Sequence, residues 1–164
     1  MQYLKKLATI SIITLAMTIG LLAQNNNSEL DTMQIADNMK FQNGVEFMKI
    51  NDYNRALNEF NEYLEIYIHG IHRGNAYREI AKIHILNFDF QRAVKAYKSI
   101  YQEYSYTDEG IDAYFEAGIC YKKMGYNNKA TEIFQYIAKE HPGTNAAYNA
   151  EIQLELIKII SPEK

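Results

Sequence analysis

The sequence predicts an all-α protein built from repeated helical hairpins. Three stretches share one pattern, in which a basic residue precedes an alanine and an aromatic follows four residues after that alanine. They recur at intervals of 37 residues and run from Arg55 to Phe60, from Arg92 to Tyr97 and from Lys129 to Phe134. An equal spacing that occurs twice in succession indicates an internal repeat. The chain has only two prolines and eight glycines, which leaves little room for strands and turns.

The same spacing extends upstream of each alanine. A small residue recurs at Gly44, Ala81 and Gly118. We expect it midway along the first helix of each hairpin, facing the alanine of the second helix, so that the two helices approach closely. The aromatic is then expected to fill the gap to the next hairpin. Because one hairpin cannot bury such a face alone, the units must stack.

Residues that favour the start or the end of a helix predict seven helices. We expect them at residues 33–50, 53–68, 73–87, 90–104, 108–124, 127–140 and 145–160. Asp52 and Asp89 are suitable N-caps for the second helix of their hairpins. Thr107 and Asp108 open a further first helix, and Gly125 ends it because glycine adopts left-handed geometry at little cost.

The N-terminus has the pattern of a secretory signal peptide. Lys5 and Lys6 precede an uncharged run of 17 residues, 7–23, which correspond to a basic n-region and an apolar h-region. The run is shorter than the ~20 residues of a membrane span, so we expect cleavage after Ala23. Leu21 fits the small-x-small cleavage rule poorly, which leaves an uncleaved anchor as the alternative.

These signals divide the chain into four parts. They are the signal peptide or membrane anchor 1–23, a polar disordered leader 24–32, the helical-repeat domain 33–160 and a short tail 161–164. The expected location is the bacterial periplasm or another exported compartment, with anchoring in the inner membrane through residues 7–23 as the alternative. No cysteine lies near the expected cleavage site, so lipidation there is not expected.

The net charge and the cysteine content limit the classes of binding partner that we expect. The net charge is −3 and no basic run is present, so nucleic acid is not an expected partner. Membrane contact is expected only through an uncleaved N-terminal segment. Cys120 is the single cysteine and lies between Ile119 and Tyr121, which indicates a buried small apolar residue.

No pattern of catalytic or metal-binding residues is present in the sequence. His69 and His72 lie three residues apart, without the cysteines or carboxylates that complete a metal site. Paired carboxylates such as Glu62 and Glu65 are typical of a solvated helix face. The sequence contains no Gly-x-Ser-x-Gly motif, phosphate loop or Cys/His constellation. We therefore predict a protein that is not an enzyme and that uses no cofactor and no metal.

The repeated residues resemble the tetratricopeptide repeat (TPR) family. In that family a small residue and an aromatic in the first helix precede an Ala-x3-aromatic pattern in the second helix and a proline at the end of the unit. The third repeat carries Tyr114, Gly118, Tyr121, Gly125, Ala130, Phe134 and Pro142, and the first carries Gly44, Phe47, Tyr53, Ala56 and Phe60. The second has His84 for the aromatic and Ser105 for the proline. The resemblance covers about residues 37–160 and implies a right-handed solenoid of three helix-turn-helix hairpins with a C-terminal capping helix.

The long units and the stretch from His141 to Ala146 look like the bacterial cell-envelope subgroup of this family. That subgroup includes outer-membrane-assembly lipoproteins and a periplasmic cell-division coordinator. The missing lipidation cysteine departs from the lipoprotein members. The resemblance implies a protein–protein interaction scaffold with protein partners in the cell envelope, in envelope or outer-membrane assembly.

The resemblance also implies a concave binding groove lined by the first helices. By repeat phase this groove presents twelve residues, here called the first-helix face: Asn38, Phe41, Val45, Met48, Asn75, Arg78, Lys82, Ile85, Asp112, Phe115, Ile119 and Lys122. Its three cations suit a protein segment with apolar anchors and an acid. The alternative is that these residues are merely solvated or packed. The family's clamp for a terminal carboxylate is not expected, because Phe41 and Val45 stand where polar groups are needed.

The last helix has two apolar sides. The side with Ile152, Leu156 and Ile159 is expected to pack on the helix that contains Phe134 and Ile137. The docking side, with Ala150, Leu154 and Ile157, is then left without a partner in this chain and is expected to bind another copy or a partner protein. An alternative function is therefore a self-associating structural protein that uses this helix. In the remaining alternative, the preceding hairpin or the chain's own termini cover both sides.

Overall fold

The computed structural model describes residues 30–160, and every regular element in that range is an α-helix. The first helix occupies residues 30–49. It is followed by α2 (Tyr53–Ile66), α3 (Arg73–Leu86), α4 (Phe90–Tyr104), α5 (Asp108–Lys123), α6 (Asn127–Glu140) and α7 (Asn145–Ile160). The chain divides into two compact units between Lys40 and Phe41. Residues 30–40 are helical, and all packing described below lies within residues 41–160.

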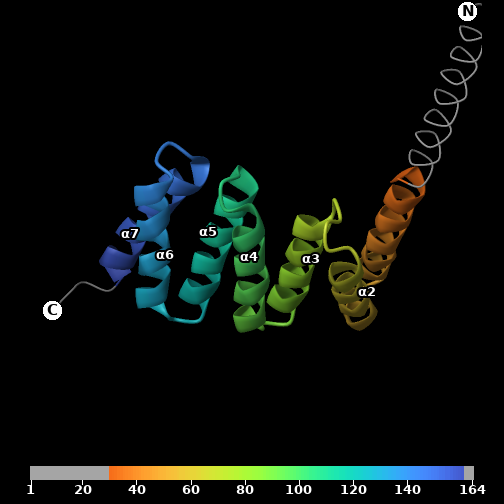
Figure 1. The fold of residues 1–164 in the computed structure, drawn as a ribbon. Coiled ribbons are helices and arrows are strands. Elements are labelled where there is room, and N and C mark those ends of the chain that lie inside the picture. The colour runs from red at the N-terminus through yellow and green to blue at the C-terminus, as the bar shows by residue number, and fades with distance from the viewer. Residues whose placement is uncertain (1–29, 161–164) are drawn as a thin grey trace, which may run out of the picture. The chain divides into compact units, whose positions relative to one another are not determined.

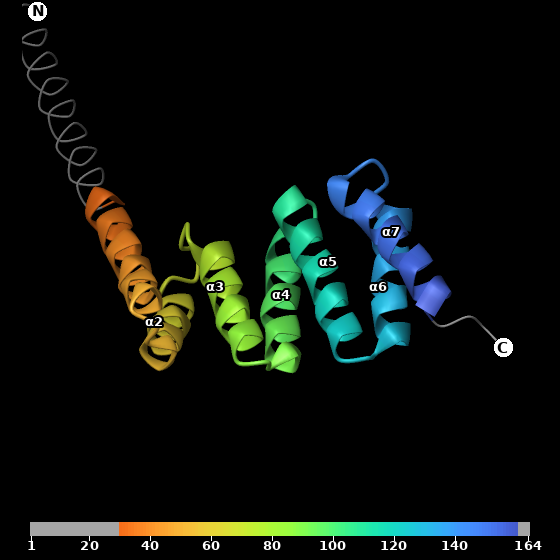
Figure 2. The same cartoon turned by 180° about the vertical axis from the view of Figure 1, so that it is seen from behind.

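Helices α2 to α7 stand side by side in a single row, in chain order (Figure 1). The turns after α3 and α5 lie along one edge of the row, and the turns after α4 and α6 lie along the opposite edge (Figure 2). Each helix contacts the next, and α5 also contacts α7. The fold is therefore an all-α helical repeat solenoid, as the sequence predicts.

The expected helix ends agree with the structure to within two residues from α2 to α7. The structure differs from the prediction in the leader 24–32. Residues 30–32 are helical, whereas the sequence predicted a disordered segment there. No glycine or proline separates these residues from the helix that follows, so nothing in the sequence stops the helix there. The predicted signal segment 1–23, residues 24–29 and the tail 161–164 lie outside the described residues. Within residues 30–160, no helix is long and apolar enough to cross a membrane.

The same left-handed turn joins the two helices of each hairpin. Asn51, Phe88 and Gly125 have φ values of 58°, 57° and 79°, and they follow one another at the repeat spacing of 37 residues. In the first two hairpins the next residue is the predicted N-cap. Asp52 and Asp89 each accept a hydrogen bond of 3.1 Å from the backbone N–H three residues later, which satisfies a donor that the helix leaves free.

An aromatic ring packs directly on a glycine inside the first and third hairpins. A Cβ atom added to Gly44 would lie 2.5 Å from the ring of Phe60, and one added to Gly118 would lie 2.6 Å from the ring of Phe134. Both rings are fully buried. The structure therefore places these rings on a glycine of their own hairpin, a contact that the sequence prediction did not include. The missing side chain of the glycine creates a space in the same hairpin, and the ring occupies that space.

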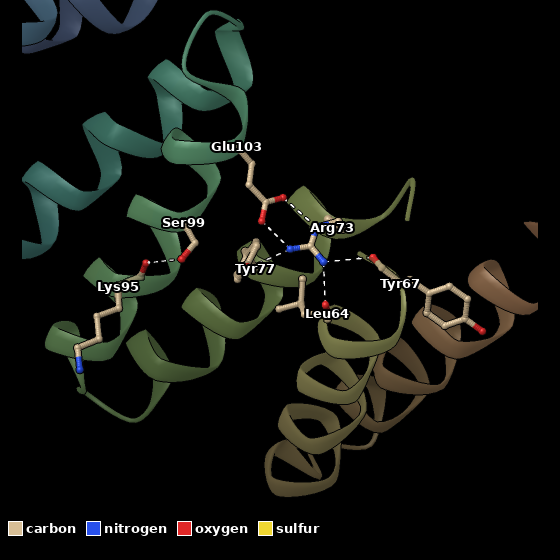
Figure 3. Close-up of polar contacts among 7 residues, drawn as sticks. All are labelled: Leu64, Tyr67, Arg73, Tyr77, Lys95, Ser99 and Glu103. Carbon is tan, nitrogen blue, oxygen red and sulfur yellow. Dashed lines mark hydrogen bonds and ion pairs between the residues drawn. The ribbon is translucent and has the colours of Figure 1, made fainter. Parts of the chain in front are cut away.

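Arg73 joins the first hairpin to the second (Figure 3). Its Nη1 donates hydrogen bonds to the backbone carbonyls of Leu64 and Tyr67, at 2.7 and 3.1 Å, where α2 ends. Its Nε and Nη2 donate to the carboxylate of Glu103 on α4, at 2.9 and 2.6 Å. The nearby guanidinium lowers the pKa of Glu103. One side chain at the start of α3 thus holds the end of α2 and the end of α4 together.

Tyrosines join the second hairpin to the third. The ring of Tyr101 on α4 stacks on Tyr114 of α5, with ring centroids 4.3 Å apart. The Tyr101 hydroxyl donates a 3.0 Å hydrogen bond to the hydroxyl of Tyr136 on α6. Burial and this hydrogen bond raise the pKa of Tyr101. The joint therefore combines apolar ring area with a polar contact.

Cys120 is buried in α5, as the sequence predicts for a small apolar residue. Burial raises the pKa of its thiol to about 11, so the side chain stays protonated at neutral pH. A buried neutral thiol contributes packing and no reactivity.

We predict that Gly118→Ala destabilises the protein by about 1–3 kcal/mol, because the added methyl overpacks against the buried ring of Phe134. Gly44→Ala should do the same against Phe60. Chemical denaturation followed by circular dichroism measures the free energy of unfolding. Glu132→Ala, on the exposed surface of α6, is the control and should stay within about 0.5 kcal/mol of wild type. Equal stability of the glycine variants and wild type would contradict the close contact.

We also predict that Arg73→Ala costs about 1–3 kcal/mol, because it removes charge-assisted hydrogen bonds and leaves carbonyls at the end of α2 unpaired. The Glu103 contribution depends on pH. Since Arg73 lowers the folded-state pKa of Glu103 below its ordinary 4.5, the contribution is complete above about pH 4.5 and is lost as the pH falls through the lowered value. The melting temperature of Glu103→Gln should therefore lie below that of wild type at pH 7 and approach it at pH 3. A difference independent of pH would refute the ion pair as the cause.

Candidate functional site

The first-helix face begins on the helix of residues 30–49, where its residues do not all behave as expected. Asn38 is exposed and belongs to the unit that ends at Lys40. Phe41 is only 8% exposed and its ring stacks on His72 with centroids 4.5 Å apart. Val45 and Met48 are half-buried against the core. Phe41 is therefore a core residue and not a groove residue, because the segment before α3 covers it.

The part of the face on α3 and α5 is accessible. Three of its residues are exposed and five are half-buried: Asn75, Lys82 and Asp112 in the first group, and Arg78, Ile85, Phe115, Ile119 and Lys122 in the second. The α3 residues recur on α5 at the repeat spacing of 37 residues. The structure thus places eight of the twelve predicted residues at equivalent positions on two first helices.

The three cations of this face already have polar partners in the protein. Arg78 Nη2 lies 3.1 Å from the Glu109 carboxylate, which links α3 to α5. Lys82 Nζ lies 2.5 Å from Glu79 on its own helix. Lys122 Nζ donates a 2.7 Å hydrogen bond to the side-chain carbonyl of Gln153, which links α5 to α7. An acidic ligand must therefore share these cations with groups of the protein or displace those groups.

Two carboxylates on α5 balance the cations. Burial is the main cause that raises the pKa of Asp112, with the nearby Asp108 adding to it. Burial also raises the pKa of Glu116, one turn further along the helix. The sequence prediction omitted Glu116, although its spacing of four residues from Asp112 places both carboxylates on one side of a helix. The face therefore carries both signs of charge.

The two apolar sides of α7 are exchanged relative to the sequence prediction. Ala150 is fully buried, and Leu154 and Ile157 pack half-buried against the core. On the other side, Ile152, Leu156 and Ile159 are 41%, 39% and 74% exposed. The side that was expected to dock a partner is therefore the packed one, and the repeat spacing gives the reason. Residues 150, 154 and 157 follow the buried Ala113, Ala117 and Cys120 of α5 by 37 residues.

A groove of about 1160 Å³ lies between α6 and α7. We call it the terminal groove. It is lined by Asn127, Asn128, Thr131 and Gln135 of α6 and by Tyr148, Glu151, Ile152, Leu154, Glu155, Leu156, Ile157 and Lys158 of α7. The exposed apolar residues of α7 thus adjoin a hollow, and polar side chains of α6 form its opposite wall. Ile152 follows Phe115 of the first-helix face by 37 residues. This repeat spacing could have identified the exposed side of α7 from the sequence.

The histidine pair does not form part of a metal site in the described structure. His69 is exposed, whereas the ring of His72 stacks on Phe41. Across residues 30–160, no group of three or more His, Cys, Asp or Glu side chains is arranged to hold a metal ion.

One family model matches part of the repeat region. Residues 112–144 match the family model described as Tetratricopeptide repeat. No curated protein matches the chain. Among solved structures, the C-terminal TPR-containing domain of an FK506-binding protein from Plasmodium falciparum is similar. It shares 19% sequence identity, covers 76% of this chain and 91% of its own, and has a TM-score of 0.49. The stretch 112–144, which begins in α5 and ends four residues after α6, is thus similar to one tetratricopeptide repeat.

Proposed function

We propose that the protein is a non-enzymatic protein–protein interaction scaffold that binds a protein segment across the first-helix face of α3 and α5. One observation carries this proposal. The eight residues of that face on the two helices repeat at equal spacing, and every one of them is exposed or half-buried. A segment lying across both helices meets similar positions twice, which suits an elongated ligand with apolar anchors and an acid.

The polar contacts that the protein makes within this face are weak enough for a ligand to replace them. The Lys82–Glu79 pair joins residues three apart on one helix, and the lysine side chain is 51% exposed. Such pairs contribute only about 0.3–0.5 kcal/mol, whereas a partly desolvated charge-assisted hydrogen bond to a ligand contributes about 1.5–3 kcal/mol. Phe115 and Ile119, which are half-buried, supply apolar area that a ligand side chain can remove from water.

The proposed cellular setting is the bacterial cell envelope, in envelope or outer-membrane assembly. It is supported by the basic and uncharged segments at residues 5–23 and by the resemblance of the long repeat units to envelope proteins. The protein is exported and cleaved near Ala23, or it stays anchored in the inner membrane by residues 7–23. Both versions place the scaffold outside the cytoplasm.

We expect the protein isolated from its own host to have an intact mass that lacks residues 1–23. The n-region and h-region direct export, and signal peptidase removes them. Intact mass spectrometry of the cell-envelope fraction provides the measurement. A mass that retains these residues would show that the segment is an anchor, and recovery from the cytoplasm alone would refute export.

We expect Lys82→Glu combined with Lys122→Glu to abolish capture of a partner from an envelope extract. The reversals place two negative charges where an acidic ligand segment binds, whereas helicity should not change at these solvent-accessible positions. The matched control is Lys95→Glu with Lys139→Glu, which changes the net charge equally on the exposed surfaces of α4 and α6. Mass spectrometry identifies the captured protein. Capture that survives in the first variant, or is lost equally in the control, would exclude this face as the binding site.

A further inference from the structure

The helix α7 starts in the same way as α5. The Thr107 hydroxyl donates to the Tyr104 carbonyl at 2.8 Å and accepts from the Gly110 N–H at 3.2 Å. Thr144 makes the same pair of contacts 37 residues later, to the His141 carbonyl at 2.9 Å and from the Ala147 N–H at 3.1 Å. The caps therefore fix the alignment of the two helices, and α7 occupies the place of the first helix of a fourth hairpin.

In the third hairpin, one side of α5 is covered by α6. The ring of Tyr114 lies 5.7 Å from Tyr136, and Gly118 lies against Phe134. The ring of Tyr121 lies 5.4 Å from the ammonium of Lys129. These three α5 residues define the surface on which a second helix packs, and we call this surface the seat.

The equivalent residues of α7, 37 positions later, are Glu151, Glu155 and Lys158, and all three line the terminal groove. The terminal groove is therefore the seat that α6 occupies in the preceding hairpin. Among residues 30–160, no second helix follows α7 to cover it.

Exposed apolar side chains accompany this seat. Tyr148 is 67% exposed, and Ile152, Leu156 and Ile159 continue the apolar surface along the helix. Several large apolar side chains exposed together on a small domain mark an interaction surface more often than isolated ones do.

The charge at the centre of the seat is acidic. Glu155 forms an exposed ion pair of 2.7 Å with Lys158, and Glu151 has no ion pair among the described residues. The two carboxylates are four residues apart, so they lie one turn apart on the same side of α7. A helix that fills the seat must therefore place cations opposite Glu151 and Glu155.

We propose that the terminal groove binds a basic amphipathic helix of a partner protein. Ten residues separate Tyr148 from Lys158, which corresponds to about 15 Å of helix or roughly three turns. The bound helix sets its apolar side on Ile152 and Leu156 and places Lys or Arg side chains, four residues apart, against Glu151 and Glu155. This goes beyond the scaffold function proposed above, since it uses α6 and α7 instead of α3 and α5 and a ligand of the opposite charge.

A second copy of this chain does not fit the seat. Its second helices α2 and α6 carry an aromatic that packs on a glycine, and even a single Cβ at Gly118 would lie 2.6 Å from the Phe134 ring. Glu155 stands at the position of that glycine, so it blocks an aromatic ring and would be buried beneath it. Two antiparallel α7 helices packed on each other about Glu155 would bring the Glu155 carboxylates of both copies together, and like charges repel.

The probe is a fluorescein-labelled 18-residue helical peptide with leucine and alanine on one side and lysines bordering that side. Its matched peptide has glutamate in place of each lysine. Fluorescence anisotropy measures binding to the protein isolated from its host. We expect the lysine peptide to bind at least tenfold more tightly than the glutamate peptide. Glu151→Lys with Glu155→Lys should reverse this preference, and Ile152→Gln with Leu156→Gln should weaken the lysine peptide about tenfold.

The control for general charge attraction is Glu46→Lys with Glu65→Lys, two exposed residues far from α7 in the sequence. It changes the net charge by the same amount and should leave the peptide preference unchanged. Equal loss of binding in this control, or no binding of either peptide to wild type, would overturn the proposal. Sedimentation equilibrium should give a monomer without peptide. A dimer that Ile152→Gln dissociates would show that a second copy fills the groove and would also overturn it.

Discussion

The close contact between a glycine of the first helix and a buried aromatic of the second is the constraint on which the first and third hairpins depend, and the second hairpin has Ala81 and Tyr97 at the same positions. In the third hairpin, Gly118 leaves space that the Phe134 ring fills completely. Gly44 and Phe60 repeat the contact in the first hairpin. A glycine in a helix costs about 0.5–1 kcal/mol relative to alanine, and burial of a large ring more than offsets this cost. The spacing of 37 residues persists because both partners must keep their places.

The first and third hairpins share the glycine–ring contact, but the joints between the hairpins use different chemistry. Arg73 joins the first two hairpins through charge-assisted hydrogen bonds to Glu103 and to carbonyls at the end of α2. Tyr101 joins the second and third through ring stacking and a hydroxyl contact. A guanidinium that donates several hydrogen bonds fixes the relative orientation of the helices it joins, whereas stacked rings contribute buried apolar area. Tyr114 belongs to the repeat pattern, but Arg73, Glu103 and Tyr101 do not, so each junction depends on residues particular to it.

These joints leave two surfaces of different character. Across α3 and α5, cations and carboxylates alternate and are partly satisfied by one another, as in the Arg78–Glu109 pair. At the end of the row, α7 combines exposed apolar side chains with two carboxylates one turn apart. The first surface suits a ligand whose polar groups replace contacts that the protein makes within this face. The second follows from the position of α7, which is aligned as a first helix and is not covered by a second helix among the described residues.

The sequence by itself determined the repeat, the helices and the turns, because these depend on residues close together in the chain. The spacing of the alanines identified the hairpins, and Asp52, Asp89 and Gly125 placed helix ends through local hydrogen bonds and backbone geometry. The sequence also named the eight accessible residues on α3 and α5, since repeat phase sets which side of a helix they share.

The tertiary structure alone decided how those sides are used. Phe41 has the phase of a groove residue, but His72, from the segment before α3, covers its ring. Both sides of α7 are apolar in sequence, and packing on α5 and α6 places Ala150 and Leu154 in the core while Ile152 stays exposed. Polar partners of Arg78 and Lys122 come from neighbouring first helices. Such contacts join residues about 30 positions apart, and local sequence patterns do not specify which of them form.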